Sequence, residues 1–317
     1  MARSFLSLGS INADFQFEVS ADLAGGGTLP AKSFVQRAGG KGANRAVFAQ
    51  RVGVAATLIG RVGEDHFAEQ AMAPLRALDL DISGVSTNSC APTAVSMIAV
   101  PDDGEKTILL ASNANRDWDA AALALLENII GNADAQAVLT LDFEVSPEAV
   151  DLALEVAAKR GLRVVADGSF GKDVKGEHLR QLYAIAPNVQ EAGVIAEMEI
   201  ASDADAEAAA RKLAQGGVDV VCVKLSDGGC LLASGGTIKR IAAPPVSVVD
   251  KTGAGDAFTA ALAIAVLEGR PALEAAAYGV AASSLAVGKN GSQEAYPTRA
   301  ELDSMFQKVL GLGSASR

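Results

Sequence analysis

A glycine-rich loop followed by an aspartate is the segment of this sequence best suited to chemistry. Gly253, Ala254 and Gly255 stand immediately before Asp256, and an apolar helical stretch follows at 257–267. Small residues at a helix start let backbone N–H groups converge on one spot, which suits a phosphoryl group that gains negative charge. Asp256 beside such an anion site could accept a hydroxyl proton. The alternative is a structural carboxylate that favours the helix N-terminus by roughly 0.3–1 kcal/mol.

A second glycine-rich segment lies near the N-terminus. Ala38–Asn44 contains three glycines around Lys41 and enters a predicted helix at Ala43. The glycines would let the backbone approach a ligand closely, and the Asn44 amide could donate to and accept from a sugar hydroxyl. The spacing matches neither a Walker loop nor a dinucleotide-binding fingerprint. A tight turn that caps a helix is therefore the alternative for this loop.

Alternating strands and helices must position both loops. Apolar runs predict strands, and segments with helical periodicity lie between them. The predicted strands cover 4–9, 56–59, 137–141, 163–166 and 219–225, and the predicted helices cover 43–52, 118–130, 147–160, 206–215 and 257–267. Repeated strand–helix units favour parallel pairing with right-handed crossovers. The expected fold class is α/β, with a doubly wound, mostly parallel sheet flanked by helices.

Two hairpin-like regions, at about 14–38 and 90–111, interrupt this alternation. In the first, Phe15–Val19 alternates apolar and polar residues before a glycine-rich turn. In the second, two β-prone runs flank Pro101-Asp-Asp-Gly104, which is a hairpin signal. We expect both regions to form one small β-sheet lid on the α/β core, within a single domain that spans residues 1–317.

Composition and charge narrow the function classes. Half of the 317 residues are hydrophobic, and 38 acidic residues outnumber 27 basic ones, which gives a formal net charge of −11. This acidic balance argues against a general nucleic-acid or membrane-surface role. Cys90, Cys222 and Cys230 have no metal-ligand spacing, and no apolar run approaches the roughly 18 residues of a membrane span. We expect a cytoplasmic enzyme with reduced cysteines.

Three segments together resemble one protein family. Gly39–Asn44 and Asp250–Asp256 are similar to the two signature segments of the ribokinase-like (PfkB-type) carbohydrate kinases, and Gly9–Asp14 resembles their sugar-binding start. The resemblance implies a ribokinase-like fold and transfer of the γ-phosphate of ATP-Mg²⁺ to a hydroxymethyl group of a small sugar, with ribose expected. Asp256 would orient the acceptor hydroxyl and take its proton, while the Gly253–Gly255 amides would stabilise the transferred group.

The resemblance also implies residues at the sugar end. Asn12 and Asp14 would hydrogen-bond the sugar hydroxyls. Glu144 falls where the family has an acidic residue on the substrate side, and the nearby Asp142 is a second candidate for that place. The residues expected to close round the sugar are Gly40, Lys41, Gly42 and Asn44.

At the nucleotide end, Asn188-Val-Gln-Glu191 resembles a family motif that organises Mg²⁺ and the phosphates, largely through water. The spacing places Asn188 and Glu191 on one helical face, and two oxygen-bearing groups suit a hydrated Mg²⁺. An ordinary helix start is the alternative. The remaining residues expected to bind ATP are Lys224, Ser226, Gly229 and Gly255. For Lys224, a surface strand end is the alternative.

A monovalent cation site is also implied. Asp250–Thr252 and Ala286–Gly291 resemble the two strips that hold K⁺ in the family, mostly through backbone carbonyls. The candidate ligands are Asp250, Thr252, Ala286, Lys289 and Gly291. Ala295 stands where a serine hydroxyl is usual, so we expect K⁺ activation that is present but weak. In the alternative, Asp250 only orders its own loop.

The rim of the sugar site departs from the pattern of the ribose-specific members at Ala21–Pro30 and at Ala166–Phe170. Kinase chemistry is therefore better supported than ribose specificity. A nucleoside kinase of the adenosine type, with Phe15 and Phe17 against the base, and a fructokinase-like enzyme are the alternative enzymes. A catalytically silent sugar- or nucleotide-binding protein is the non-enzyme alternative. Because the lids of the family's homodimers pack on each other, we expect a homodimer through the lid.

Overall fold

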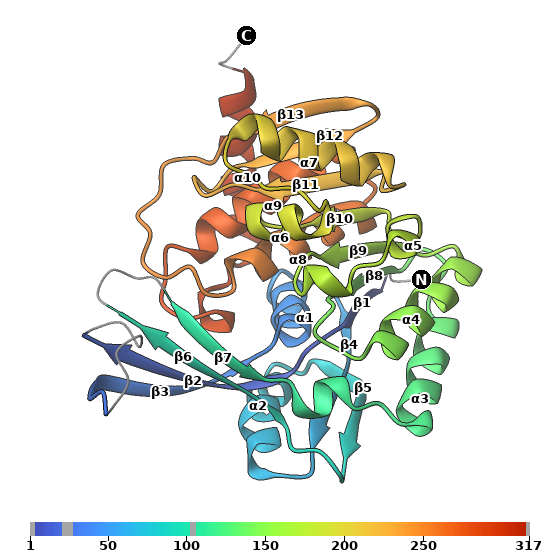
Figure 1. Cartoon of the computed structure of the whole chain (residues 1–317), viewed down its shortest axis with the longest axis vertical. Helices are drawn as coiled ribbons and strands as arrows, with labels where there is room; N and C mark the ends of the chain where they lie inside the picture. Colours follow the sequence, from blue (N-terminus) through green and yellow to red (C-terminus); the bar gives the residue numbers. More distant parts are fainter. Residues whose placement is uncertain (1–3, 21–27, 102–105, 315–317) are drawn as a thin grey trace.

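Two β-sheets organise the chain in the computed structural model, which describes residues 4–20, 28–101 and 106–314 (Figure 1). Within these residues the larger sheet has nine strands: β1 (Phe5–Leu8), β4 (Ala56–Gly63), β5 (Asp81–Asn88), β8 (Val138–Leu141), β9 (Arg163–Asp167), β10 (Ala184–Ala186), β11 (Val220–Lys224), β12 (Cys230–Ser234) and β13 (Thr237–Ile241). Their order is β13-β12-β11-β10-β9-β8-β1-β4-β5. All neighbours from β11 to β5 pair in parallel, which confirms the predicted fold class.

The last two strands of this sheet depart from the parallel rule. β12 and β13 are antiparallel to their neighbours, because the chain reverses directly after β11. Gly228 adopts a positive φ of 87° in that turn, a conformation that glycine reaches without a steric penalty.

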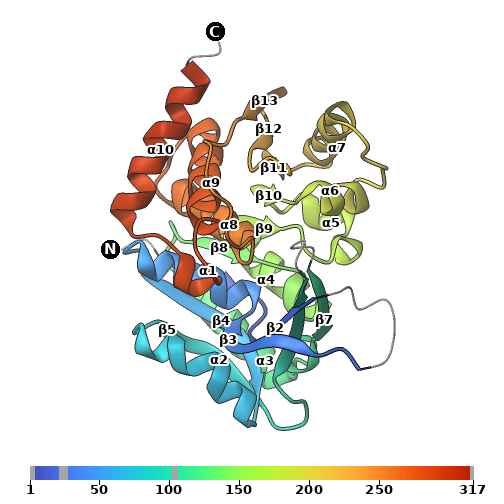
Figure 2. The same ribbon diagram turned by 90° about the vertical axis from the view of Figure 1, so that its left-hand side faces the viewer.

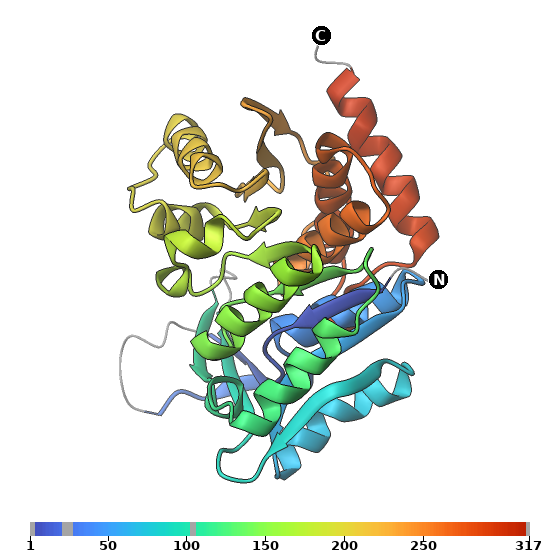
Figure 3. The same cartoon turned by 90° about the vertical axis from the view of Figure 1, so that its right-hand side faces the viewer.

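Helices cover both faces of the large sheet. On one face lie α1 (Lys41–Arg51), α2 (His66–Ala77), α8 (Ala254–Leu267), α9 (Ala272–Ala286) and α10 (Arg299–Ser314). On the other face lie α3 (Ala120–Gly131), α4 (Pro147–Arg160), α5 (Gly176–Leu179), α6 (Val189–Ile195) and α7 (Asp203–Gln215). Figures 2 and 3, seen from opposite sides, show α8–α10 and α4–α7 on opposite flanks. Short 3₁₀ helices lie at Asn113–Arg116, Gly171–Asp173 and Gln293–Ala295.

Capping residues explain where the predicted helices begin. The helix predicted at 147–160 is confirmed as α4, because the Ser146 side chain caps the Ala149 amide at 3.2 Å and Pro147 fits the first turn. The helix predicted from 118 starts later, since Asp119 caps it. The helix predicted from Ala43 starts earlier, at Lys41, because Gly40 adopts a φ of 94° at its N-cap.

The smaller sheet consists of β2 (Asn12–Val19), β3 (Ala31–Gly39), β6 (Ala94–Val100) and β7 (Thr107–Ala111). Its order is β3-β2-β6-β7, and it projects from one side of the large sheet (Figure 1). These strands come from the two regions predicted to form a lid. Parts of those regions, the glycine-rich turn within 21–27 and the hairpin turn at 102–105, lie outside the described residues.

The two faces of the lid differ in character. Asp14 in β2 faces a cavity, whereas Phe15 and Phe17 alternate to the opposite face. There Phe15 stacks on Phe34 at 5.9 Å between ring centroids and contacts Phe67 of α2 edge-on at 5.6 Å. No helix in the described part of the chain is long and apolar enough to cross a membrane.

Candidate active site

The polar residues of the site follow the carboxyl ends of parallel strands. Ser10, Asp142 and Lys224 lie at or just after the ends of β1, β8 and β11, and Asp167 and Asn188 do so for β9 and β10. β1 lies between β8 and β4, so the strand order reverses there. In open α/β sheets, ligands bind outside the carboxyl ends of the strands at such a reversal. The sheet topology thus brings together residues that are far apart in the sequence.

A cavity of about 420 Å³ lies between this edge and the lid. The predicted sugar-side residues that line it are Asn12, Asp14, Gly40, Lys41, Asn44 and Glu144. The predicted phosphate-side residues that line it are Asn188, Thr252, Gly253, Gly255 and Asp256. A larger hollow of about 470 Å³ beside α2 and β5 contains none of the predicted residues. The two glycine-rich loops therefore meet at one cavity.

The start of α8 provides amide donors. Gly253 is its N-cap with φ 72°, and an added Cβ there would come within 2.7 Å of Ser292, so glycine is required. The amides of Gly255 and Asp256 lie in the first turn, where no carbonyl within the helix can accept them. Ala254 is the exception among the predicted residues, because its amide donates to the Lys251 carbonyl at 3.4 Å. We therefore place the anion site at the other amides.

Asp256 is buried, and only one of its two carboxylate oxygens accepts a hydrogen bond from the described residues. Asn44 Nδ2 donates to Asp256 Oδ2 at 2.7 Å, and Gln293 fixes the Asn44 amide by donating to its Oδ1 at 3.1 Å. Asp256 Oδ1 has no hydrogen-bond partner among the described residues. A buried carboxylate oxygen without a partner marks a place where a ligand donates a hydrogen bond. Gln293 was not predicted, because only the folded chain brings it beside Asn44.

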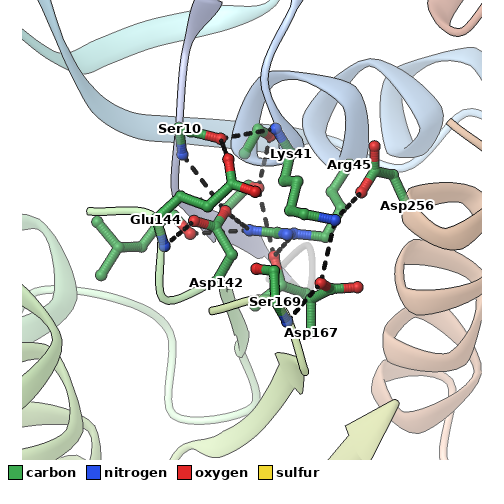
Figure 4. A network of polar contacts seen from close by, with 12 residues as sticks. Ser10, Lys41, Arg45, Asp142, Glu144, Asp167, Ser169 and Asp256 are labelled. Atoms are coloured by element: carbon green, nitrogen blue, oxygen red, sulfur yellow. Dashed lines mark hydrogen bonds and ion pairs between the residues drawn. The ribbon is translucent and has the colours of Figure 1, made fainter. Parts of the chain in front are cut away.

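Two lysines converge on a buried aspartate that was not predicted as a site residue. Lys41 Nζ lies 3.2 Å from Asp167 Oδ1 and 3.6 Å from Asp256 Oδ1 (Figure 4), and Lys224 Nζ lies 3.2 Å from Asp167 Oδ2. Burial alone would lower the pKa of Lys41, but Asp167 and Asp256 outweigh it and raise that pKa well above its ordinary value. Burial would likewise raise the pKa of Asp167, but Lys224 and Lys41 hold it well below its usual range. The two ammonium groups therefore balance the charges of Asp167 and Asp256 at this site.

Of the two acidic candidates for the sugar side, Glu144 faces the cavity. It accepts a hydrogen bond from Ser10 Oγ at 2.7 Å. Asp142 instead pairs with Arg45 at 2.8 Å, and both side chains are fully buried (Figure 4). Burial raises the pKa of Glu144 to about 8. Burial also raises the pKa of Asp14 to about 7, and Asp14 Oδ1 has no hydrogen-bond partner among the described residues.

These two raised pKa values predict a pH dependence of stability. Glu144 and Asp14 have folded pKa values of about 8 and about 7, above their ordinary values of 4.5 and 3.8, so the folded protein binds more protons than the unfolded chain between these limits. Their contribution to the free energy of unfolding is therefore full below about pH 4 and is lost as the pH rises through 7 and 8. Urea unfolding of the ligand-free protein should show less of this decline in Glu144→Gln than in the wild type. The exposed Glu155→Gln is the control, and equal pH profiles for all three proteins would contradict the prediction.

The comparison with known proteins decides the family. Residues 2–299 match the model of the pfkB family carbohydrate kinases. The chain belongs to this family. One relative is the ribokinase of Haemophilus influenzae, which is 31% identical over 95% of this chain and 97% of the relative. Another is the ribokinase of Schizosaccharomyces pombe, which is 28% identical over 94% of this chain and 96% of the relative. The structure of Arabidopsis thaliana ribokinase complexed with ribose and ATP superposes with a TM-score of 0.84 at 27% identity, covering 97% of this chain and 99% of that one. Phosphofructokinase-2 of Escherichia coli in complex with potassium shares the fold, with a TM-score of 0.78 at 22% identity and 98% and 99% covered.

Some residues predicted for this carbohydrate kinase lie away from the cavity. Gly42 packs on Gly9, whose carbonyl carbon would lie 2.6 Å from an added Cβ, so its role in the structure is close packing of α1 on β1. Ser226 is exposed in the turn after β11, and Gly229 is buried at the end of that turn. The structure does not bring these three residues to the cavity wall.

The predicted Mg²⁺ residues of the kinase lie at the start of α6. Asn188 is the N-cap, and the Glu191 amide donates to its Oδ1 at 2.8 Å. Glu191 Oε2 in turn accepts from the Asn188 amide at 2.8 Å, which is the reciprocal capping box. Asn188 and Glu191 therefore do form an ordinary helix start, and these two hydrogen bonds hold both side chains in place. In residues 4–20, 28–101 and 106–314, no group of three or more His, Cys, Asp or Glu side chains is arranged to hold a metal ion.

The two strips predicted to hold a monovalent cation lie side by side in the kinase. The Gly291 amide donates to Asp250 Oδ2 at 3.0 Å, and the Val249 and Asp250 amides donate to the Val287 carbonyl. Lys289 is exposed and lies 3.6 Å from Glu301. Lys106 from the lid, which was not predicted, contacts Asp250.

Proposed function

We propose that this chain is an ATP-dependent kinase that phosphorylates the hydroxymethyl group of ribose. The observation that carries the proposal is the buried Oδ1 of Asp256, which accepts no hydrogen bond from the described residues and lies beside the first-turn amides of α8. The ribokinase relatives and the ribose- and ATP-bound neighbour support the choice of both substrates. Coupled measurement of ADP release with ribose, 2-deoxyribose, fructose and adenosine tests it. Ribose should give the highest kcat/KM, and no sugar-dependent ADP release would favour a silent binding protein.

Asp256 would act as the base of this reaction. Asn44 holds Asp256 Oδ2, so Oδ1 is left to accept the proton of the acceptor hydroxyl. Because phosphoryl transfer passes through a loose transition state, the acceptor hydroxyl loses its proton late, so the reaction does not require a strong base. The Gly255 and Asp256 amides would stabilise the charge on the transferred group. ATP with Mg²⁺ supplies the phosphoryl group when bound.

The side of the cavity proposed to bind the nucleotide has two lysine ammonium groups and few side chains that could bind a metal ion. Lys41 and Lys224 would offset the charge of the phosphates, and Lys224 Nζ would lie 3.3 Å from a Cβ added at Gly255, so both line the approach to the amides. Asn188 and Glu191 would hold Mg²⁺ largely through water, with Asp167 nearby as a further carboxylate. This sparse set suits Mg²⁺, which keeps several waters and takes the rest of its shell from phosphates.

The nucleoside alternative finds no support in the lid. Phe15 and Phe17, the residues predicted to stack on a base, lie on the face of β2 away from the cavity. On the cavity face stand Asn12 and Asp14 instead. Asn12 is held by Asn115 at 2.9 Å and by Ser96 at 3.2 Å, so its amide is fixed before ligand arrives. These polar groups suit sugar hydroxyls better than a planar base.

Replacing Asp14 by alanine tests the sugar end. At pH 8, above its pKa of about 7, Asp14 is ionised, and its buried Oδ1 accepts no hydrogen bond from the described residues. At that pH the variant should lose a charged hydrogen bond to the sugar, worth about 1.5–3 kcal/mol or roughly a 10- to 150-fold rise in the ribose KM. The ATP KM should change little, since Asp14 lies on the lid. Steady-state kinetics with each substrate varied in turn decides this. An equal loss for both substrates would place Asp14 outside the sugar site.

The proposed enzyme is one kinase domain, cytoplasmic, and a homodimer through the outer face of its lid. Met97 and Leu109 form a cross-strand pair there, and Leu109 is 62% exposed. On the same face, Phe34 of β3 pairs with Phe17 of β2 and is also exposed. Such an apolar face favours burial against a second copy. Sedimentation should show a dimer at micromolar concentration, and Leu109→Asp should shift it to monomer. A monomeric wild type would overturn this part of the proposal.

A further inference from the structure

A lysine of the lid contacts the loop that precedes the anion site. Lys106 directly precedes β7, and its Nζ lies 2.5 Å from Asp250 Oδ1 and contacts Thr252 Oγ1. Both partners are largely buried, with side-chain exposures of 18% for Lys106 and 8% for Asp250. The contact spans 144 positions of sequence, so it joins the lid to the core.

The Asp250 carboxylate is fully engaged in this arrangement. Oδ1 accepts from Thr252 N at 2.9 Å and from Thr252 Oγ1 at 2.7 Å, and Oδ2 accepts from Gly291 N at 3.0 Å. Burial would raise the pKa of Asp250, but the contacts with Lys106 and Thr252 outweigh it and lower that pKa to about 2. Asp250 therefore carries one negative charge, and the Lys106 ammonium neutralises it.

Because the Lys106 ammonium balances the charge of Asp250, no uncompensated negative charge remains there to bind a second cation. Asp250 is the one formal charge among the predicted ligands of the two strips, apart from the exposed Lys289, which is itself cationic. A free K⁺ at Asp250 would share the carboxylate with an ammonium a few ångströms away, and like charges that close repel each other in a partly buried site. An ammonium group is monovalent and binds the same carboxylate and hydroxyl oxygens as K⁺ does.

We propose that the Lys106 ammonium serves as the built-in monovalent cation of the Asp250–Thr252 loop, so that the enzyme does not require K⁺. By holding Asp250 and Thr252 from the lid, Lys106 positions the Gly253, Gly255 and Asp256 amides. Lys106 is thus a positioning residue for phosphoryl transfer. This replaces the weak K⁺ activation expected from the sequence and differs from the potassium complex of the E. coli neighbour. The activity readout below rests on the proposed function, whereas the thermal readout does not.

The test compares salts and variants. Wild type, Lys106→Met and the surface control Lys159→Met are assayed in KCl and in tetramethylammonium chloride at equal ionic strength. Wild type and Lys159→Met should show kcat and Tm values that are the same in both salts. In tetramethylammonium, Lys106→Met should lose roughly tenfold in kcat, and KCl should restore most of it. KCl should also raise the Tm of Lys106→Met alone, by about 2 °C, because K⁺ then binds only the folded state.

Several outcomes would overturn the proposal. K⁺ activation of the wild type by several-fold would show that the ammonium does not replace the ion, and this measurement needs no variant. A Lys106→Met protein with full activity and no response to K⁺ would show that the loop needs no cation. Loss of activity without recovery of kcat or Tm in KCl, in both Lys106→Met and Lys106→Gln, would assign Lys106 another role. If ribose is not the substrate, the Tm comparison still decides, because it requires no turnover.

Discussion

Replacing Asp256 by asparagine should lower kcat by about 10²–10⁴-fold while both KM values stay within a few-fold. Asparagine has nearly the same shape, and it can still contact Asn44, so the cavity should keep its form. It cannot take a proton from the acceptor hydroxyl. Steady-state kinetics in ribose and ATP, with a thermal melt to confirm folding, gives the result. Near-normal turnover would mean that another group takes the proton.

A matched control separates this role from a helix-start effect. Asp205 occupies the third position of α7, as Asp256 does in α8, but it lies on the surface, away from the cavity. Asp205→Asn removes the same charge from the same place in a helix, where carboxylates typically stabilise by roughly 0.3–1 kcal/mol. We expect a small loss of stability and an unchanged kcat. If Asp256→Asn behaved like Asp205→Asn, the structural alternative for Asp256 would be correct.

Replacing Arg45 by methionine should cost about 3–5 kcal/mol of unfolding free energy, because it leaves Asp142 as a buried charge without its partner. Neither side chain is exposed, and Arg45 also donates to the Leu8 carbonyl at 2.9 Å. Asp142 accepts from the Ser10 amide at 3.3 Å and from the Glu144 amide at 3.0 Å. The ribose KM should therefore rise as well, since both amides shape the sugar side of the cavity. Urea denaturation and ribose kinetics on one preparation measure the two effects.

The double variant Arg45→Met/Asp142→Leu should recover part of the lost stability, because no buried charge remains. The surface pair Lys159–Glu155 is the comparison, and Lys159→Met there should cost less than about 1 kcal/mol. A double variant no more stable than Arg45→Met would mean that the loss comes from packing and from the hydrogen bonds of Arg45 instead of the unpaired charge.

Local patterns in the sequence determined most of the elements and both loops. Alternation of apolar strands and helices predicted the parallel sheet, since βα units pair in only a few ways. The glycines of the two loops marked the two helix starts, where Gly40 and Gly253 adopt positive φ as the N-caps of α1 and α8. The antiparallel pairing of β12 and β13 was not predicted, because the periodicity of a strand carries no information about the direction of its neighbour.

Tertiary structure alone decided which side chains share the cavity. Asn44 and Asp256 meet across 212 positions, and Lys106 and Asp250 across 144. Spacing could not separate Asp142 from Glu144; the fold did, by burying Arg45 against Asp142. It also turned Phe15 away from the cavity and placed Asp167 between Lys41 and Lys224. Helix and strand propensities and hydrophobic periodicity depend on residues that are close in the sequence. The partners of a charged side chain depend on which strand ends lie together in the folded sheet.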